Sequence, residues 1–159
     1  QTYRRELRII DEYHNSGEAI AHYVEVIKSK PYRYENFIFP HDATVRSLND
    51  NKSRVDIFRE HGIYGSILPR GEIHNGIELV RAWLPYTYID SSLQYIIDTF
   101  NNYSKEWNER AGTWASKPLH NEWSNPADAI RYMCQSLPKL VSTHSSQVSS
   151  YKVNQGYDI

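Results

Sequence analysis

The sequence predicts an α/β domain, and three observations support that class. Short apolar runs bounded by turn residues alternate with amphipathic stretches of helical periodicity, as strands and helices do in α/β proteins. The 159 residues match one ordinary domain, which can bury a core without a disulfide or a structural metal. Aromatic residues make up 13% of the chain, which excludes a disordered protein.

Four short apolar runs have the composition of strands, each bounded by turn or breaker residues. They cover residues 6–14, 36–39, 65–68 and 86–89. We expect the run at 6–14 to lie beside the run at 36–39, with helices on both faces of the sheet.

Five stretches have helical periodicity, and capping residues or prolines mark their boundaries. The first carries an apolar stripe over residues 20–27 and stops at Pro31. The next three are expected to begin at a polar cap that has an acid or an amide three positions later. Their caps are Ser53, Asn75 and Ser91. The last helix is expected after the cap Asn125, with Pro138 as its end.

Residues 103–117 interrupt the alternation and predict a β-hairpin. Trp107 and Trp114 flank the turn-prone segment 108–112, in which Gly112 can take a positive φ. Two roles are open to the hairpin: it contacts DNA or regulates access to the site, or its two indole rings pack on the core, which is the expected arrangement for the indoles. Residues 139–159 are rich in Ser and read as a flexible or loosely docked tail outside the folded unit 1–138.

The net charge and the cysteine content give limited information about the partners and the compartment of the protein. The net charge of −1 gives no overall sign of a nucleic-acid or membrane partner, and no apolar run is long enough to span a bilayer. Lys52, Arg54 and Arg59 form a small local group of basic residues. Such a group is most often simply a part of the surface that faces solvent. The single cysteine, Cys134, excludes an internal disulfide and is typical of a reducing compartment.

Two aspartates are the candidate site residues. Asp42 directly follows the strand at 36–39, and sites in open α/β sheets form at the carboxyl ends of strands. Asp128 lies three positions after Asn125 and off the apolar stripe, so it is free to face a cleft. Each has a structural alternative: Asp42 as a turn former, and Asp128 as a carboxylate that stabilises a helix N-terminus. From position alone, these alternatives are the simpler interpretation.

Motifs for other chemistries are missing from the sequence. It contains no Cys-x-x-Cys or His-Glu-x-x-His, which argues against a zinc site, and no Gly-rich phosphate loop or Gly-x-Ser-x-Gly elbow. Among the seven histidines, His41 and His120 lie near the candidate positions and are candidates for orienting site residues.

Several short strings, in order and spacing, carry a resemblance to a known family. They are His22-Tyr23-Val24, Phe39-Pro40-His41-Asp42-Ala43, Lys52-Ser53-Arg54, Asn75-Gly76-Ile77 with Arg81, Lys117-Pro118-Leu119-His120, and Ala127-Asp128-Ala129 with Arg131-Tyr132. From about Leu7 to Leu137 the chain resembles the C-terminal nuclease domain of the large terminase subunit of tailed bacteriophages.

The resemblance implies an RNase H-like mixed sheet flanked by helices and a metal-dependent endonuclease that cuts concatemeric viral DNA during genome packaging. Asp42 and Asp128 match two acidic positions of the family that hold two Mg²⁺ or Mn²⁺ ions. Lys52 and Arg54, beside Asp42, would contact DNA phosphates. The implied partners are double-stranded viral DNA, the portal and the small terminase subunit, in the cytoplasm of the infected bacterial host, and no membrane.

The chain departs from the family pattern in two ways. The family's first strand, which supplies the first catalytic acid, and its ATPase domain are absent, so we expect a fragment of a longer protein, lacking its first strands and feeble or inactive alone. His120-Asn121 and Asn125-Pro126 replace the family's His-Asp and Ser-His, so no further roles are carried over there. The competing interpretations are a non-catalytic RNase H-like module that docks DNA or a packaging partner, and an unrelated structural α/β domain.

Overall fold

The computed structural model describes residues 1–3 and 6–144, with the side chains of 1–2 and 6–137. Its strands are β1 (Thr2–Tyr3), β2 (Glu6–Ile9), β3 (Phe37–Phe39), β4 (Gly65–Ile67), β5 (Thr87–Ile89), β6 (Lys105–Asn108) and β7 (Thr113–Pro118). Its helices are α1 (Ile20–Ser29), α2 (Arg54–Glu60), α3 (Ile73–Trp83), α4 (Gln94–Asn102) and α5 (Ser124–His144), with 3-10 turns η1 (His41–Thr44) and η2 (Leu84–Tyr86). The fold is therefore mixed α/β, as the sequence predicts.

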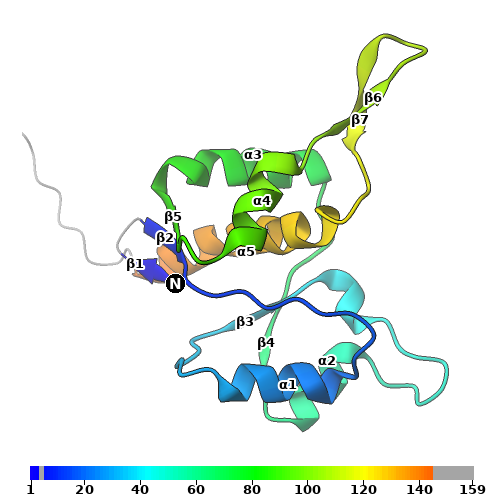
Figure 1. The fold of residues 1–159 in the computed structure, drawn as a ribbon. Coiled ribbons are helices and arrows are strands. Elements are labelled where there is room, and N and C mark those ends of the chain that lie inside the picture. The colour runs from blue at the N-terminus through cyan, green and yellow to red at the C-terminus, as the bar shows by residue number, and fades with distance from the viewer. Residues whose placement is uncertain (4–5, 145–159) are drawn as a thin grey trace, which may run out of the picture.

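Two lobes divide the described chain (Figure 1). In one lobe, β2 lies between antiparallel β1 and parallel β5, beside α3, α4 and α5; in the other, β3 and β4 form a parallel pair with α1 and α2. The expected pairing of the strand at 6–14 with the strand at 36–39 is therefore wrong. The two strands bury their apolar side chains in different cores, so neither needs the other as a neighbour.

Each lobe has its own buried apolar cluster. The first contains Leu7, Ile9, Leu93, Ile96, Ile130, Cys134 and Leu137. The second contains Val24, Phe39, Ala43, Val55 and Ile63. Burial of each large aliphatic or aromatic side chain stabilises the fold by roughly 1.5–3 kcal/mol. Burial also raises the pKa of the Cys134 thiol to about 11, so this cysteine is a core residue rather than a nucleophile.

The helix ends test the capping predictions. Ser53 caps α2 in a reciprocal pair with Asp56, as predicted. The cap predictions for α3 and α4 are wrong: α3 begins at Ile73, and α4 begins only at Gln94 because the Asp90 carboxylate accepts bonds from Ser92 and closes a turn first.

Helix α5 is longer than predicted at both ends. It begins at Ser124 rather than after Asn125, because Asn121 closes a turn by bonding the Trp123 N–H and the Ser124 hydroxyl. It also continues through Pro138 to His144, although an interior proline removes one backbone hydrogen bond and crowds the carbonyl four residues earlier. Residues 145–159 of the expected tail lie outside the described residues.

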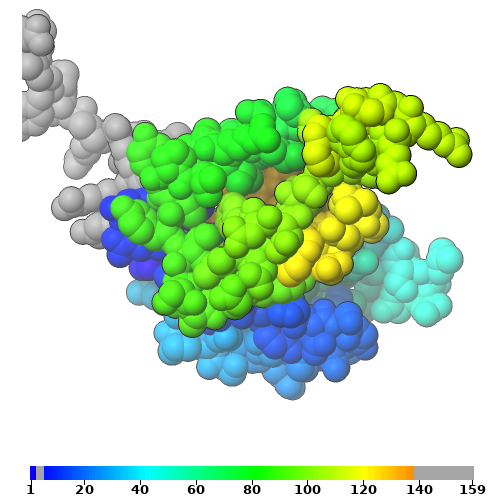
Figure 2. Space-filling view, turned by 45° about the horizontal axis from the view of Figure 1, so that its top comes forward, coloured from blue at the N-terminus to red at the C-terminus, as the bar shows by residue number. Residues whose placement is uncertain are grey.

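The hairpin prediction is confirmed, but the position of its indoles is not. Strands β6 and β7 pair antiparallel, with Trp107 opposite Trp114 and Gly112 at φ +59° in the turn. The two indoles pack edge to face on each other, 5.0 Å apart, and remain 48% and 58% exposed. The hairpin projects from the rest of the fold in Figure 1, and both indoles are exposed, so the expected packing of the indoles on the core is wrong. Figure 2 shows its tip protruding from the surface.

Candidate functional site

The two candidate aspartates lie on elements that meet between the lobes. Asp42 lies in η1, directly after β3, and Asp128 lies in the first half of α5. Strand β3 packs against α5, and Nδ1 of His41 lies 3.2 Å from the Tyr132 hydroxyl. His41 precedes Asp42, and Tyr132 lies one helical turn after Asp128. The fold thus brings the segments that carry both aspartates to the same junction.

Asp42 faces solvent beside an arginine from the next helix. Its Oδ2 lies 3.6 Å from Nη1 of Arg54, and the two side chains are 57% and 63% exposed. An ion pair so exposed contributes at most about 1 kcal/mol, and its partners exchange easily. Asp42 does lie in a short turn, as its structural alternative requires, yet its carboxylate pairs with a side chain.

Asp128 is held much more firmly. Its Oδ1 accepts hydrogen bonds from Nη2 and Nε of Arg131, at 2.9 and 3.2 Å. The Arg131 side chain is only 7% exposed, whereas that of Asp128 is 48% exposed. Burial alone would lower the pKa of Arg131, but the hydrogen bond and charge of Asp128 outweigh it and raise that pKa. Since the first turn of α5 contains no acid, the capping alternative for Asp128 is wrong.

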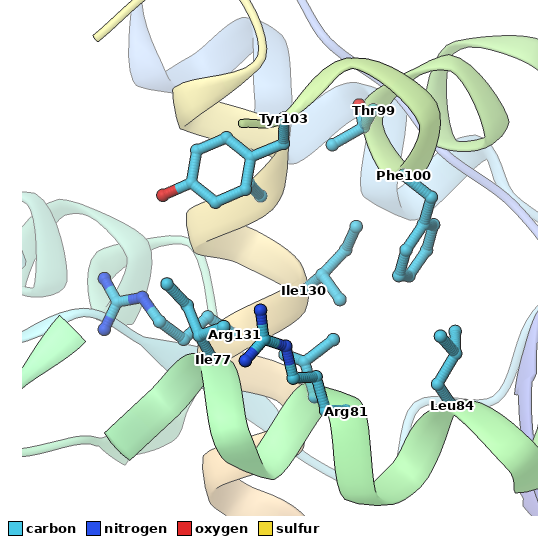
Figure 3. Close-up of a pocket in the computed structure, with 10 residues that line it drawn as sticks. Ile77, Arg81, Leu84, Thr99, Phe100, Tyr103, Ile130 and Arg131 are labelled. Atoms are coloured by element: carbon cyan, nitrogen blue, oxygen red, sulfur yellow. The ribbon is translucent and has the colours of Figure 1, made fainter. Parts of the chain in front are cut away.

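A cavity of about 220 Å³ adjoins this pair, between α3, α4 and α5 (Figure 3). Its walls are mainly apolar, and its polar lining includes Arg81, Arg131 and Tyr103. Figure 3 shows Arg81 of α3 and Leu84 of η2 on one wall of this cavity, with Phe100 and Tyr103 on the opposite wall. Burial, followed by the charge of Asp128, raises the pKa of Tyr103.

The predicted DNA-binding residues are already paired with acids. Lys52 lies 2.7 Å from Glu60, which raises the lysine's pKa, and Arg54 pairs with Asp42. Arg59 lies 3.7 Å from Asp56. Each of the three basic side chains is at least 46% exposed. A DNA phosphate can therefore compete with the acidic partner for each of them. The loop between η1 and α2 projects on the same side of the molecule as the hairpin (Figures 1 and 2).

The carboxylates of Asp42 and Asp128 are the type of ligand that a hard divalent cation prefers, but two carboxylates are too few to hold one. Mg²⁺ and Mn²⁺ prefer oxygen ligands and usually take six, several of them water. Within residues 1–3 and 6–144, no group of three or more His, Cys, Asp or Glu side chains has a metal-holding arrangement. Asp42 and Asp128 would therefore supply part of a coordination shell, to be completed by water, substrate phosphate or acids elsewhere in the protein.

Arg131 and Tyr132 are the site residues to which the sequence assigned no role. The i, i+3 spacing of Asp128 and Arg131 could have predicted their ion pair. Nothing in the local sequence signals that Tyr132 reaches His41, because that contact depends on how the lobes meet.

Comparison with known proteins places the chain in no family: no family model, no curated protein and no solved structure matches it significantly. Within the described residues, no helix is both long enough and apolar enough to cross a membrane.

Proposed function

We propose that the chain is the nuclease part of a viral DNA-packaging enzyme, a metal-dependent endonuclease of the RNase H-like kind. Two lines of reasoning support the proposal: the resemblance of its motif strings to the large terminase subunit, and the junction described above. The observation that carries it is the contact between His41 and Tyr132, which joins the segments of Asp42 and Asp128. This contact supports the proposal because it links the segment that follows β3 to helix α5.

In this proposal, Asp42 and Asp128 are the carboxylates that bind Mg²⁺ or Mn²⁺. When bound, the cations supply electrophilic stabilisation of the charge that develops on the scissile phosphate. Asp42 can exchange its exposed Arg54 partner for a cation at little cost, and Arg54 then becomes available to a DNA phosphate. Lys52 would act on the neighbouring phosphate after leaving Glu60.

The proposal includes the partners and compartment that the resemblance implies. The substrate is double-stranded concatemeric viral DNA, the partners are the portal and the small terminase subunit, and the site of action is the cytoplasm of the infected bacterium. The motor activity of such a packaging enzyme would reside outside these 159 residues.

A second candidate is a non-catalytic module of the same fold that docks DNA or a packaging partner. The observation that favours it is the pairing of each candidate carboxylate with an arginine, Asp42 with Arg54 and Asp128 with Arg131. A carboxylate that only balances an arginine needs no metal, and the exposed Arg54 would then be a residue that meets DNA.

Cleavage of supercoiled plasmid by the full-length protein separates the two candidates. With Mg²⁺ or Mn²⁺, the nuclease proposal expects relaxed and linear products, which are lost in EDTA and in Asp42→Asn. Asp98→Asn, which removes a carboxylate on α4 that accepts a bond from Gln94, is the matched control and should cut normally. Binding of the plasmid without metal-dependent cutting would favour the docking module instead. The 159-residue chain alone should cut feebly or not at all.

A further inference from the structure

The cavity between α3, α4 and α5 has two arginines and, among the described residues, no acid in its lining. We propose that it binds a small organic anion: an apolar body of about the size of one ring, which carries a single carboxylate or phosphate group. This inference is independent of the proposed nuclease function, because it concerns a different ligand and needs no metal.

The polar and apolar groups of the lining lie at opposite ends of the cavity in Figure 3. The guanidinium groups of Arg81 and Arg131 and the hydroxyl of Tyr103 lie at one end. Phe100 and Leu84 lie at the other end. An amphipathic ligand can therefore place its charged group against the arginines and its apolar body against the hydrocarbon walls.

Arg131 supplies a buried positive charge at the polar end. Its side chain is only 7% exposed, and its Nε and Nη2 donate to Oδ1 of Asp128, which does not line the cavity. A guanidinium carries five N–H donors, so Arg131 keeps donors for a second acceptor. Hydrogen bonds to a charged group are strongest where water is excluded, which favours an anion beside this buried arginine.

Gly76 on α3 makes room for this arginine. A Cβ at position 76 would lie 2.5 Å from both Cγ and Cδ of Arg131. Those carbons belong to the middle of a buried stem, which cannot swing away as a free side-chain end can. The missing side chain of Gly76 therefore lets the Arg131 stem pass between α3 and α5 on its way to the cavity.

Arg81 supplies a second positive charge at the mouth of the cavity. Its Nη1 donates to Oε1 of Glu78 at 2.7 Å, but the two side chains are 66% and 50% exposed. So exposed a pair is weak, and a ligand anion can replace Glu78 or share the guanidinium with it. The planar guanidinium matches the geometry of both carboxylate and phosphate groups, so either group suits this position.

The size of the cavity sets the size of the ligand. An apolar cavity of about 150 Å³ is large enough to bind benzene. The present cavity of about 220 Å³ can therefore hold a six-membered ring together with one small anionic group. Leu84 on its lining is 47% exposed, so the cavity opens to solvent and a ligand can enter without unfolding of the domain.

Isothermal titration of the 159-residue chain with benzoate and with phenyl phosphate tests the proposal and distinguishes the two anionic groups. We expect saturable binding of at least one of them, with a dissociation constant of about 1 mM or lower. Benzamide has nearly the same shape as benzoate and no charge. If benzoate binds, benzamide should bind about 10-fold more weakly, because it lacks the charge-assisted bonds. The proposal is wrong if neither anion binds saturably, or if benzoate binds no better than benzamide.

Arginine variants test whether the charge is recognised at this cavity. Arg81→Met should weaken binding of the anion about 10-fold and leave benzamide unaffected. Arg59→Met provides the matched control, because Arg59 is also an exposed helical arginine paired with an acid three positions earlier, on α2. Equal affinities of the Arg81 and Arg59 variants for the anion would overturn the assignment.

A pair of alanine variants on α5 tests the location independently. Ala127 lines the cavity, whereas Ala129 is exposed on the same helix. Ala127→Leu should fill part of the cavity and remove binding of the anion, and Ala129→Leu should bind it as the unaltered chain does. Full binding by folded Ala127→Leu would contradict the proposal. If Ala127→Leu does not fold, the Arg81 and Arg59 variants still decide the question.

Discussion

His41 and Tyr132 are 91 positions apart in the chain, and their side chains meet with Nδ1 of His41 3.2 Å from the tyrosine hydroxyl. This contact joins the lobe built on β3 and β4 to helix α5 of the other lobe (Figure 1). Asp42 directly follows His41, and Asp128 lies one helical turn before Tyr132. The contact therefore joins the two segments that carry the aspartates marked by the sequence as site candidates.

We expect the exposed hairpin to contact a binding partner and to contribute little to the stability of the fold. Deleting residues 105–115 from the full-length protein should change the free energy of unfolding by less than about 0.5 kcal/mol, because the removed side chains pack mainly on one another. The same deletion should weaken DNA binding or alter cleavage, since two exposed indoles offer stacking surfaces for bases worth about 1–3 kcal/mol each. Chemical denaturation and a fluorescence binding assay measure the two effects.

A variant with both Trp107→Ala and Trp114→Ala separates the indoles from the hairpin backbone. If this variant binds and cuts DNA as the unaltered protein does, the indoles have no role with DNA. A large loss of stability would instead indicate contacts that the hairpin makes elsewhere in the full-length protein.

The basic pair beside Asp42 should contribute to the salt dependence of DNA binding. Replacing both Lys52 and Arg54 by Ala should weaken binding and reduce the slope of log affinity against log salt by about 1.8, as expected for two lost phosphate contacts. The exposed residues Lys28 and Arg33 provide the control, because changing both to Ala removes the same charge. An unchanged slope in the Lys52 and Arg54 variant would mean that neither residue contacts phosphate.

The cap of α2 makes the stability of the fold depend on pH in the acid range. The backbone N–H of Ser53 donates to Asp56, and this bond, followed by the Ser53 side chain, lowers the pKa of Asp56 below its ordinary value of 3.8. The stabilisation is therefore present above pH 3.8 and is lost as the pH falls through the lower pKa of the folded state. Asp56→Asn should lack this dependence, and its unfolding curve should approach that of the unaltered chain in acid.

Ser53→Ala tests the other half of the cap at neutral pH. It should lower the free energy of unfolding by about 1 kcal/mol, and Ser53→Thr, which keeps a hydroxyl, should lose less. Equal stability of the Ala variant and the unaltered chain would show that the cap contributes nothing.

Local patterns in the sequence predict the elements well and their arrangement poorly. The stripe of α1, the capping box at Ser53 and the Trp107–Trp114 hairpin all follow from neighbours in the chain, and all are present. The pairing of β2 with β5 rather than β3 depends on which core each strand enters, and short strands carry too few residues to specify that. The prediction that the two indoles pack on the core is wrong for a related reason. A large apolar side chain favours burial, but its sequence does not indicate which surface would cover it.

The sequence marks the two candidate acids but gives no sign of the side chains that surround them. Asp42 and Asp128 stand out by position and by the motif resemblance, whereas the seat of Arg131 depends on the close approach of α3 at Gly76. That approach is a property of helix packing, and no single segment of the sequence contains it.

Cleavage rates of Asp42→Asn, Asp128→Asn and the double variant in the full-length protein test the central claim most directly. If the two carboxylates act on one metal site, each single variant should lose as much Mn²⁺-dependent plasmid cleavage as the double variant, because residues that act as a unit are not additive. All three proteins should keep the unfolding transition of the unaltered protein to within about 1 kcal/mol. Persistent metal-dependent cleavage by folded Asp128→Asn or folded Asp42→Asn would contradict the claim that these two aspartates form the site.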